Sequence, residues 1–211
     1  MNSSEPVSGA IFPTAYFPNV AYLAEIIKHN TVYIEICETY PKQTIRNRCT
    51  ILSANGLLNL TVPVLKVNGN HTKTSDIQLF GDEPWQPNHF RAIESAYKSS
   101  PYYDYYIHHF EKIFTNKFES LIDLNTEILS TIFRILKLKI SVHYTSDFVK
   151  ETHNGIDFRQ SFNAKIKENP AFYRPYNQVF SNKFPFQPNL SFPDLLFNEG
   201  PNALMYLQKN M

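Results

Sequence analysis

The sequence has almost no net charge and lacks the glycine motifs of nucleotide-binding proteins. Its 20 Lys and Arg residues nearly balance 19 Asp and Glu residues, which gives a formal charge of +1. A chain without excess positive charge has no general attraction for nucleic acid, so we expect no nucleic-acid partner. No GxGxxG or Walker motif occurs, and we therefore expect no dinucleotide or ATP cofactor.

Cysteine is also scarce. The two cysteines, Cys37 and Cys49, and the seven histidines show neither CxxC nor HxxxH spacing. A disulfide framework needs more cysteines, and a structural zinc site needs ligands at such spacings. The sequence therefore predicts no metal site.

Long apolar runs are missing as well. No uncharged apolar run approaches the roughly 20 residues that span a membrane. The first residues, MNSSEPVSGAIFP, lack the basic start and apolar run of a signal peptide. With 43% hydrophobic and 18% charged residues, the composition is that of a soluble globular protein, and we expect a cytoplasmic location without a membrane span.

The chain between residues 8 and 145 has no repeat or break in composition, which predicts one α/β core domain. A short apolar segment at 8–14 precedes VAYLAEIIKHN, whose Val20, Leu23 and Ile26 share one helical face. The run TVYIEICET is rich in β-branched residues and predicts a strand. Strand, helix and strand in this spacing form a βαβ unit with a parallel strand pair.

The dipeptide Asn55-Gly56 predicts a β-hairpin with a two-residue type I′ turn. That turn would pair Ala54 with Leu57 and Arg48 with Pro63. Alternation along the strands then places Arg48 on a polar face and Cys49 on the apolar face. We therefore predict that Cys49 is buried and contributes to packing.

From Pro84 onward the pattern becomes helical. We expect one helix capped by Asn88, a second over 99–114, and a long third helix over 118–138, followed by a short strand over 139–144. Residues 146–211, rich in Pro, Asn and Phe, predict loops that wrap the core and end in short helices. The expected fold is an α/β protein with a mixed sheet, a βαβ unit, a hairpin, several helices and this C-terminal extension.

Three cations occur within seven residues of the stretch TYPKQTIRNRC: Lys42, Arg46 and Arg48. Lys42 and Arg46 share a face in a strand or in a helical turn, because a spacing of four suits both. The cluster is either a solvated face that pairs with Glu35 and Glu38, or an anion site in which arginine binds phosphate through two hydrogen bonds.

The position of this cluster favours an anion site. Ligands of open α/β sheets collect beyond the carboxyl ends of parallel strands, where TAYFPN and CETYPK follow the two predicted strands. The first loop also leads into a helix that begins at Asn19, and the free backbone N–H groups of a helix N-terminus favour anions.

Glu35 lies in the middle of a predicted core strand. A buried carboxylate is costly unless it is paired, so we expect a partner, with Arg46 or Arg48 as the candidates. The pair is either a structural ion pair, or Glu35 is a ligand for a substrate amine or hydroxyl.

His89 lies near the sole tryptophan, Trp85, at the start of a predicted helix. The helix dipole disfavours a charged histidine there, and a neutral imidazole suits a general base. The alternative is a structural histidine.

Six segments, in this order, resemble the WbqC-like family of bacterial proteins and its Bacteroidetes-type members in particular: TAYFPNVAYLAEI, ETYPKQTIRNRC, ANGLLNLTVPV, WQPNHFRAIESAYKSSPYYDYY, FESLIDLNTEIL and NLSFPDLLFNEGP. Many relatives open with H-Q-P-x-Y-x-P. This chain instead reads PTAYFPN, so Tyr16 and Pro18 match but the leading His and Gln are absent.

The resemblance implies a role in O-antigen or other surface-polysaccharide biosynthesis, with acyl or aminoacyl (glycine) transfer onto an amino sugar. The expected partners are a nucleotide-linked or lipid-linked sugar and an activated acyl donor. Lys42, Arg46 and Arg48 would hold the phosphates, with Asn47, which matches the family pattern, and Asn19 beside them. The alternative is a non-catalytic binding or assembly protein that recognises the same carrier.

The transferase hypothesis gives four further residues a role. Glu35 would orient the acceptor amine and His89 would take its proton. Tyr16 and Trp85 would stack on the sugar.

Overall fold

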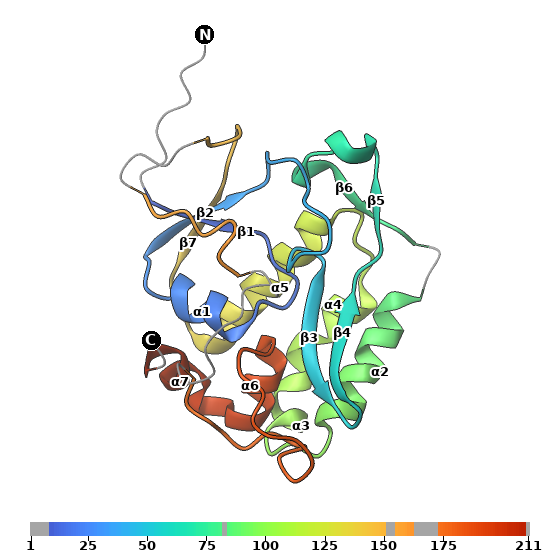
Figure 1. Cartoon of the computed structure of the whole chain (residues 1–211), viewed down its shortest axis with the longest axis vertical. Coiled ribbons are helices and arrows are strands. Elements are labelled where there is room, and N and C mark those ends of the chain that lie inside the picture. The colour runs from blue at the N-terminus through green and yellow to red at the C-terminus, as the bar shows by residue number, and fades with distance from the viewer. Residues whose placement is uncertain (1–8, 82–83, 151–154, 163–172, 210–211) are drawn as a thin grey trace.

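Among the described residues, the largest sheet has three strands, all parallel. The structure is a computed structural model and describes residues 9–81, 84–150, 155–162 and 173–209. The sheet has the order β1-β2-β7, with β1 at Ala10–Pro13, β2 at Thr31–Glu35 and β7 at Ser141–Tyr144. Helix α1, Val20–Ile26, connects β1 to β2, and the two strands pair in parallel. The predicted βαβ unit and the strand at 139–144 are therefore confirmed (Figure 1).

Two antiparallel hairpins stand beside this sheet. The first joins β3, Arg48–Ser53, to β4, Gly56–Thr61, and the second joins β5, Val64–Lys66, to β6, Ile77–Leu79. The fold is thus α/β with both parallel and antiparallel pairs, as the sequence predicts, although they form three separate small sheets rather than one mixed sheet.

The register predicted for the first hairpin is wrong by two residues. Ser53 pairs with Gly56 and Arg48 pairs with Thr61, so the turn is centred on Ala54 and Asn55. A type I′ turn at Asn55-Gly56 requires a positive φ at both residues, and only Gly56 has one, at 102°. Because side chains alternate with period two, a shift of two residues leaves each side chain on its predicted face.

Four helices follow the hairpins: α2 at Trp85–Tyr97, α3 at Tyr103–Tyr106, α4 at Glu111–Thr115 and α5 at Leu121–Leu136. The predicted helix over 99–114 is therefore broken into α3, a 3₁₀ turn and α4. The predicted cap is also wrong, because α2 begins three residues before Asn88, after Pro84. His89 consequently lies in the second turn of α2.

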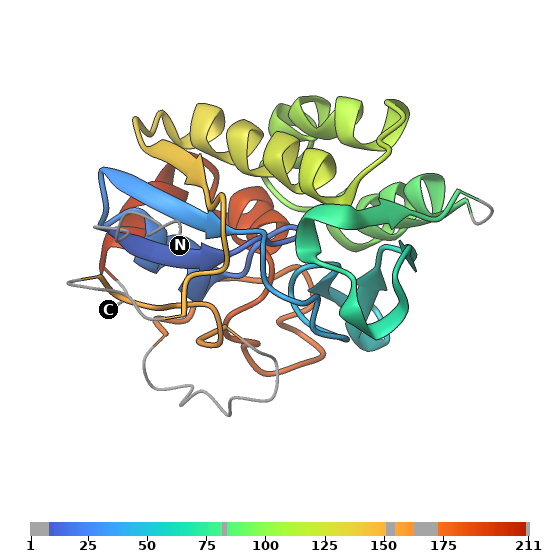
Figure 2. The same ribbon diagram turned by 90° about the horizontal axis from the view of Figure 1, so that it is seen from above.

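Helix α5 covers one face of the parallel sheet, as Figure 2 shows. Ser120 caps this helix by accepting a hydrogen bond from the backbone N–H of Asp123. Its apolar face is fully buried at Leu121, Leu124, Ile128 and Ile132, which follow the three- and four-residue spacing of a helix. The predicted long helix over 118–138 is therefore confirmed.

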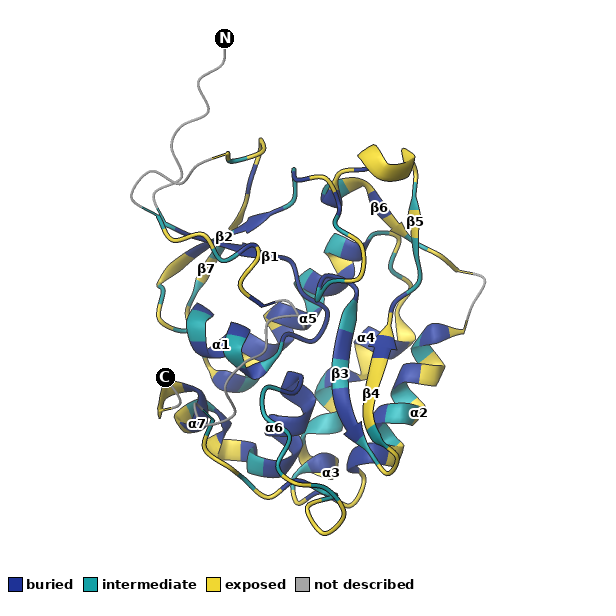
Figure 3. Cartoon of the chain, in the orientation of Figure 1, coloured by how far each residue is buried: buried dark blue, intermediate teal, exposed yellow. Residues whose placement is uncertain are grey.

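The C-terminal extension packs against the core and ends in two helices, α6 at Phe192–Glu199 and α7 at Ala203–Lys209. Phe192 and Phe197 of α6 are buried, and Phe158 stacks on Phe12 of β1 at a ring distance of 4.8 Å. Figure 3 shows buried residues where β1, α5 and α6 converge. The extension thus contributes aromatic side chains to the common core.

Candidate functional site

A cleft of about 370 Å³ opens between the first hairpin, the start of α1 and the loop before α6. We call it the hairpin cleft. Its lining comes from four parts of the chain that are distant in sequence: Phe17 and Asn19; residues 43–59, with Gln43, Thr44, Ile45, Arg48, Cys49, Thr50, Leu57 and Asn59; Phe162; and residues 187–191.

Unusual backbone conformations gather around the hairpin cleft. Among the described residues, four non-glycine residues have a positive φ, and three of them line the cleft: Phe17 at 41°, Gln43 at 59° and Asn189 at 52°. Such conformations are costly, above all for a bulky residue such as Phe17, and they cluster at functional sites. The fourth, Lys137, ends α5. The backbone therefore marks the hairpin cleft as the candidate site.

The start of α1 forms one wall of the cleft, but its backbone donors are already used. Val20 donates to the carbonyl of Leu190, Ala21 to Oδ1 of Asn189 at 2.8 Å, and Tyr22 to Oδ1 of Asn19 at 3.0 Å. The prediction that these N–H groups are free for an anion is therefore wrong. Because the backbone of Tyr22 must donate, Asn19 accepts through its oxygen, and its Nδ2 remains as a hydrogen-bond donor.

The hairpin forms the opposite wall. Arg48, Thr50, Asn59 and Leu57 alternate onto the same face and line the cleft. The Thr50 hydroxyl lies 2.7 Å from Oδ1 of Asn59, and the Thr50 backbone donates to Oγ of Ser191 at 2.9 Å. Nε of Arg48 is buried and has no hydrogen-bond partner among the described residues. Among the described residues, this Nε–H is therefore a hydrogen-bond donor without an acceptor.

The three clustered cations do not form one site. Residues 42–47 are bends and turns, so the alternation that links Arg48 to Thr50 does not extend back to Lys42. Lys42 is exposed and lies near Lys66, whose pKa is lowered by desolvation and by repulsion from Lys42. Arg46 is buried. Only Arg48 of the three lines the cleft.

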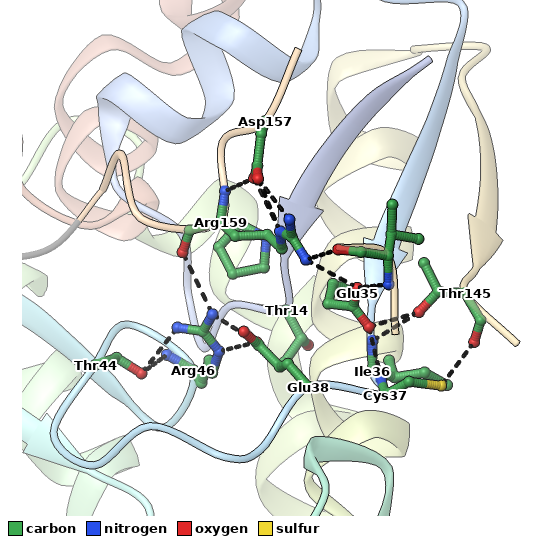
Figure 4. A network of polar contacts seen from close by, with 12 residues as sticks. Thr14, Glu35, Ile36, Cys37, Glu38, Thr44, Arg46, Thr145, Asp157 and Arg159 are labelled. Atoms are coloured by element: carbon green, nitrogen blue, oxygen red, sulfur yellow. Dashed lines mark hydrogen bonds and ion pairs between the residues drawn. The ribbon is translucent and has the colours of Figure 1, made fainter. Parts of the chain in front are cut away.

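Arg46 is committed to a buried ion pair with Glu38 (Figure 4). Its Nε donates to Oε1 of Glu38 at 2.7 Å, and its other nitrogens donate to Thr44 and to the carbonyl of Arg159. Burial raises the pKa of Glu38, and the attraction of Arg46 opposes this rise. This pair ties the 38–46 segment to the C-terminal extension.

Glu35 pairs with Arg159, so the predicted pairing with Arg46 or Arg48 is wrong. The carboxylate is 0% exposed. Oε1 accepts hydrogen bonds from the backbone of Cys37 and the hydroxyl of Thr145, both at 2.8 Å, and Oε2 accepts from Val149 and Arg159. With both oxygens used inside the protein, Glu35 is not presented to a substrate in this structure.

Arg159 joins the two parts of this network, as Figure 4 shows. It also binds Asp157 through Nε and a terminal nitrogen, and these hydrogen bonds lower the pKa of Asp157. Sequence reasoning missed Arg159, which lies 124 residues from Glu35.

Tyr16, Trp85 and His89 form a buried aromatic group, in which Tyr16 also packs edge-on against Phe17 at a ring distance of 5.0 Å. The Tyr16 hydroxyl lies 2.8 Å from Nδ1 of His89. The rings of Tyr16 and His89 both pack edge-on against Trp85, and they are tilted relative to each other. Burial lowers the pKa of His89 to about 4, and a hydrogen bond to the Thr61 backbone opposes this shift. His89 is therefore neutral through burial rather than through the helix dipole, and none of the three rings lines the cleft.

Asn47 has a structural position at the base of the hairpin. Its Nδ2 donates to the backbone carbonyl of Val62 at 2.9 Å, and its backbone carbonyl accepts a hydrogen bond from the N–H of Val62. Asn47 thus holds the chain as it leaves β4.

Two further observations concern the described part of the chain. No three His, Cys, Asp or Glu side chains in it come together as ligands for a metal ion. None of its helices combines the length and apolar character needed to cross a membrane.

Comparison with known proteins gives a family. The model of the WbqC-like protein family matches residues 14–172, which is well over half of the chain. The protein belongs to the WbqC-like family. The region that defines the family contains the hairpin and the start of α1, whereas residues 187–191 of the cleft lie beyond it.

A relative of this WbqC-like protein is found in Mycobacterium tuberculosis strain H37Rv. The chain is 24% identical over 221 residues to Uncharacterized protein Rv1507c, and the alignment covers 92% of this chain and 91% of the relative. No solved structure matches the chain.

Proposed function

We propose that this WbqC-like protein binds a phosphorylated sugar, linked to a nucleotide or a lipid carrier, in the hairpin cleft during surface-polysaccharide biosynthesis. The observation that carries the proposal is the guanidinium of Arg48, which lines the cleft with a buried Nε that no described residue satisfies. The polysaccharide context rests on the family resemblance.

The charge of the lining supports an anionic ligand. Among the described lining residues, Arg48 is the charged side chain, and none is a carboxylate. A partly buried arginine without an acidic neighbour gains a charge-assisted hydrogen bond when a phosphate arrives. The planar guanidinium also matches two phosphate oxygens at once.

The remaining polar side chains suit a sugar. Amides and hydroxyls surround Arg48, and the Nδ2 group of Asn19 is a donor whose orientation the α1 backbone fixes. Sugar hydroxyls both donate and accept hydrogen bonds, which neutral amides and hydroxyls satisfy without a cost in buried charge.

Acyl or aminoacyl transfer onto an amino sugar is the second candidate. In this reaction the sugar nitrogen forms a bond to the acyl carbon, the activated donor loses its leaving group, and the nitrogen loses a proton. The base that the sequence predicts for this step, His89, is neutral but does not line the cleft, and its Nδ1 is hydrogen-bonded to the Tyr16 hydroxyl, so the proton would have to reach it by way of Tyr16. The donor would be activated by another enzyme.

Thermal unfolding with added UDP-glucose or another nucleotide sugar tests the binding proposal. A ligand at about 100 times its Kd stabilises a protein by about 2.7 kcal/mol, which for a chain of this size raises Tm by roughly 5–10 °C. Arg48→Lys keeps the charge and loses the fork, so protection should fall. Arg91→Lys, at an exposed arginine on α2, is the matched control and should keep it. Protection that is equal in both variants would overturn the proposal.

A transfer assay separates the two candidates. Nucleotide amino sugars and activated acyl donors are incubated with the protein, and conjugates are sought by mass spectrometry. If His89 takes the proton, the His89→Gln variant should still be stabilised against heat by the nucleotide sugar, but its transfer rate should fall by a factor of about 10²–10⁴. Full turnover in His89→Gln would remove His89 from the reaction, and protection without any conjugate would favour the binding protein.

A further inference from the structure

The first hairpin has two outer edges, and the rest of the protein covers the edge of β3. The Thr50 backbone donates to Oγ of Ser191 and accepts from the Ser191 N–H, and the Leu52 N–H donates to the Tyr97 hydroxyl. Ser191 precedes α6, and Tyr97 is the last residue of α2. The backbone groups of Thr50 and Leu52 therefore point away from β4 and have partners.

The outer edge of β4 has no such cover in the described part of the chain. Asn59 pairs with Thr50, and Leu57 pairs with Leu52. In an antiparallel ladder, the two residues of such a pair turn their backbone groups away from each other, so those of Leu57 and Asn59 point to the outer edge. Neither residue's N–H or carbonyl bonds to a described residue there. Figure 3 shows β4 exposed over most of its length.

Strand β4 also lacks the features that protect strand edges in natural proteins. Such edges are guarded by a charged side chain, a proline or a bulge. The sequence of β4, GLLNLT, contains no charge and no proline, and its pairing with β3 is unbroken. Leu57 is 58% exposed and Leu58 is 37% exposed, on opposite faces of the strand. An unguarded apolar edge of this kind is a template for a further strand.

A second copy of the chain suits this edge. A twofold axis brings the same surface of two copies together, and across such an axis neighbouring strands run antiparallel. Each residue of β4 would then face a residue of the same strand, and like charges in facing positions would repel. No charged residue occurs from position 56 to position 65, so nothing in this stretch opposes the contact.

One register uses every free backbone group of the edge. When the pairing is centred on Leu58, Leu57 of each copy exchanges both backbone hydrogen bonds with Asn59 of the other. A register centred on Asn59 would instead need Thr61, whose backbone already bonds to His89. The register centred on Leu58 sets the two Leu58 side chains directly opposite each other, with Cα atoms about 4.5 Å apart.

We infer that the protein forms a twofold dimer through the outer edges of β4. The hairpins of the two copies then form one continuous antiparallel sheet. Because the axis is perpendicular to this sheet, both hairpin clefts open on the same face of it. Leu57 of one copy lies beside Asn59 of the other, which covers a leucine that a single chain leaves exposed. This inference does not depend on what the cleft binds.

Sedimentation of charge variants of the full chain tests the dimer. The parent should sediment with twice the mass of one chain. Leu58→Lys and Leu58→Glu should each be monomeric, because two like charges meet at the axis, and an equimolar mixture of the two variants should restore the dimer. Met205→Lys alters an exposed side chain of α7, away from the hairpin (Figure 1), and should remain dimeric. Melting curves show whether each variant is folded.

A cysteine variant tests the register without added charge. Two opposed residues at position 58 lie within the Cα separation that a disulfide spans. Mild oxidation of Leu58→Cys should therefore link two copies, whereas Met205→Cys, which has the same native Cys37, should not be linked.

A parent protein that is monomeric would overturn the inference and leave the edge of β4 to an extended peptide. A dimer that persists in both charge variants would place the contact elsewhere and overturn it too. Folded monomers that the mixture does not restore, or a Leu58→Cys variant that links no faster than Met205→Cys, would show that Leu58 does not meet its own copy. Either result would contradict the inferred dimer.

Discussion

The buried histidine predicts a specific loss of stability in acid. His89 is 6% exposed, and burial lowers its pKa from about 6.5 to about 4. In the unfolded chain it titrates near its ordinary pKa, so between these two values the unfolded state binds more protons than the folded state. Stability must therefore fall as the pH decreases through this window.

The size of this loss follows from the two pKa values. At about pH 7.5 both states hold a neutral imidazole, and the contribution is close to zero. At about pH 5 the unfolded state is largely protonated while the folded state is not, which costs about 2 kcal/mol. That is a substantial part of the ~5–15 kcal/mol that stabilises a typical domain.

Urea unfolding at these two pH values measures the loss, and the fluorescence of Trp85, packed against His89, reports it. His89→Gln is the matched variant, because it removes the titration and leaves other titrating groups, such as Asp194 and Glu38, in both proteins. The wild type should lose about 2 kcal/mol more than His89→Gln between pH 7.5 and pH 5. Equal losses would refute the reasoning that burial keeps His89 neutral.

Three further substitutions or modifications test the fold. Glu35→Ala removes the buried acceptor of four hydrogen bonds, one of them from Arg159, and should cost about 3–5 kcal/mol in urea unfolding; a stability equal to the parent would contradict the buried network. Burial raises the pKa of Cys49 to about 12, so a thiol reagent should modify the partly exposed Cys37 first, and rapid modification of Cys49 in the native protein would contradict its packing. Gly56→Ala, at a φ of 102°, should destabilise by about 1 kcal/mol, and a neutral result would count against the observed turn.

Much of the fold could be predicted from the local pattern of apolar and polar residues. The apolar face of α5 and the polar face of the first hairpin follow from spacings within a single segment, and the parallel pair of β1 and β2 follows from the order strand, helix, strand. These features depend on which side of an element is buried, and a sequence records that directly. The turn of the hairpin does not depend on faces, and its register was therefore missed by two residues.

The partner of Glu35 could not be found from spacing. Proximity in the sequence favours Arg46 as the partner, but Arg46 forms its ion pair with Glu38. The partner of Glu35 is Arg159, which belongs to the C-terminal extension. A buried charge predicts that a partner exists and not which one it is, because the choice depends on tertiary packing.

The hairpin cleft was only partly visible in the sequence. Arg48 and Asn19 were predicted as site residues and both line it, whereas Gln43 and Asn189 were missed. Asn tolerates left-handed backbone better than most residues, but nothing in a short motif indicates that Asn189 and Gln43 line the same cleft. Asn189 lines the cleft because the tertiary fold brings residues 187–191 to the first hairpin and the start of α1.

The Nε–H resonance of Arg48 offers the most direct test that this arginine binds phosphate. In a ¹H–¹⁵N spectrum of the arginine side chains, the signal is assigned by its loss in Arg48→Lys. Addition of a nucleotide sugar should move this signal downfield, as a charge-assisted hydrogen bond forms to a group that has no partner within the described part of the chain. A nucleotide sugar that binds the protein without moving the Arg48 signal would contradict the account, because the phosphate would then lie elsewhere.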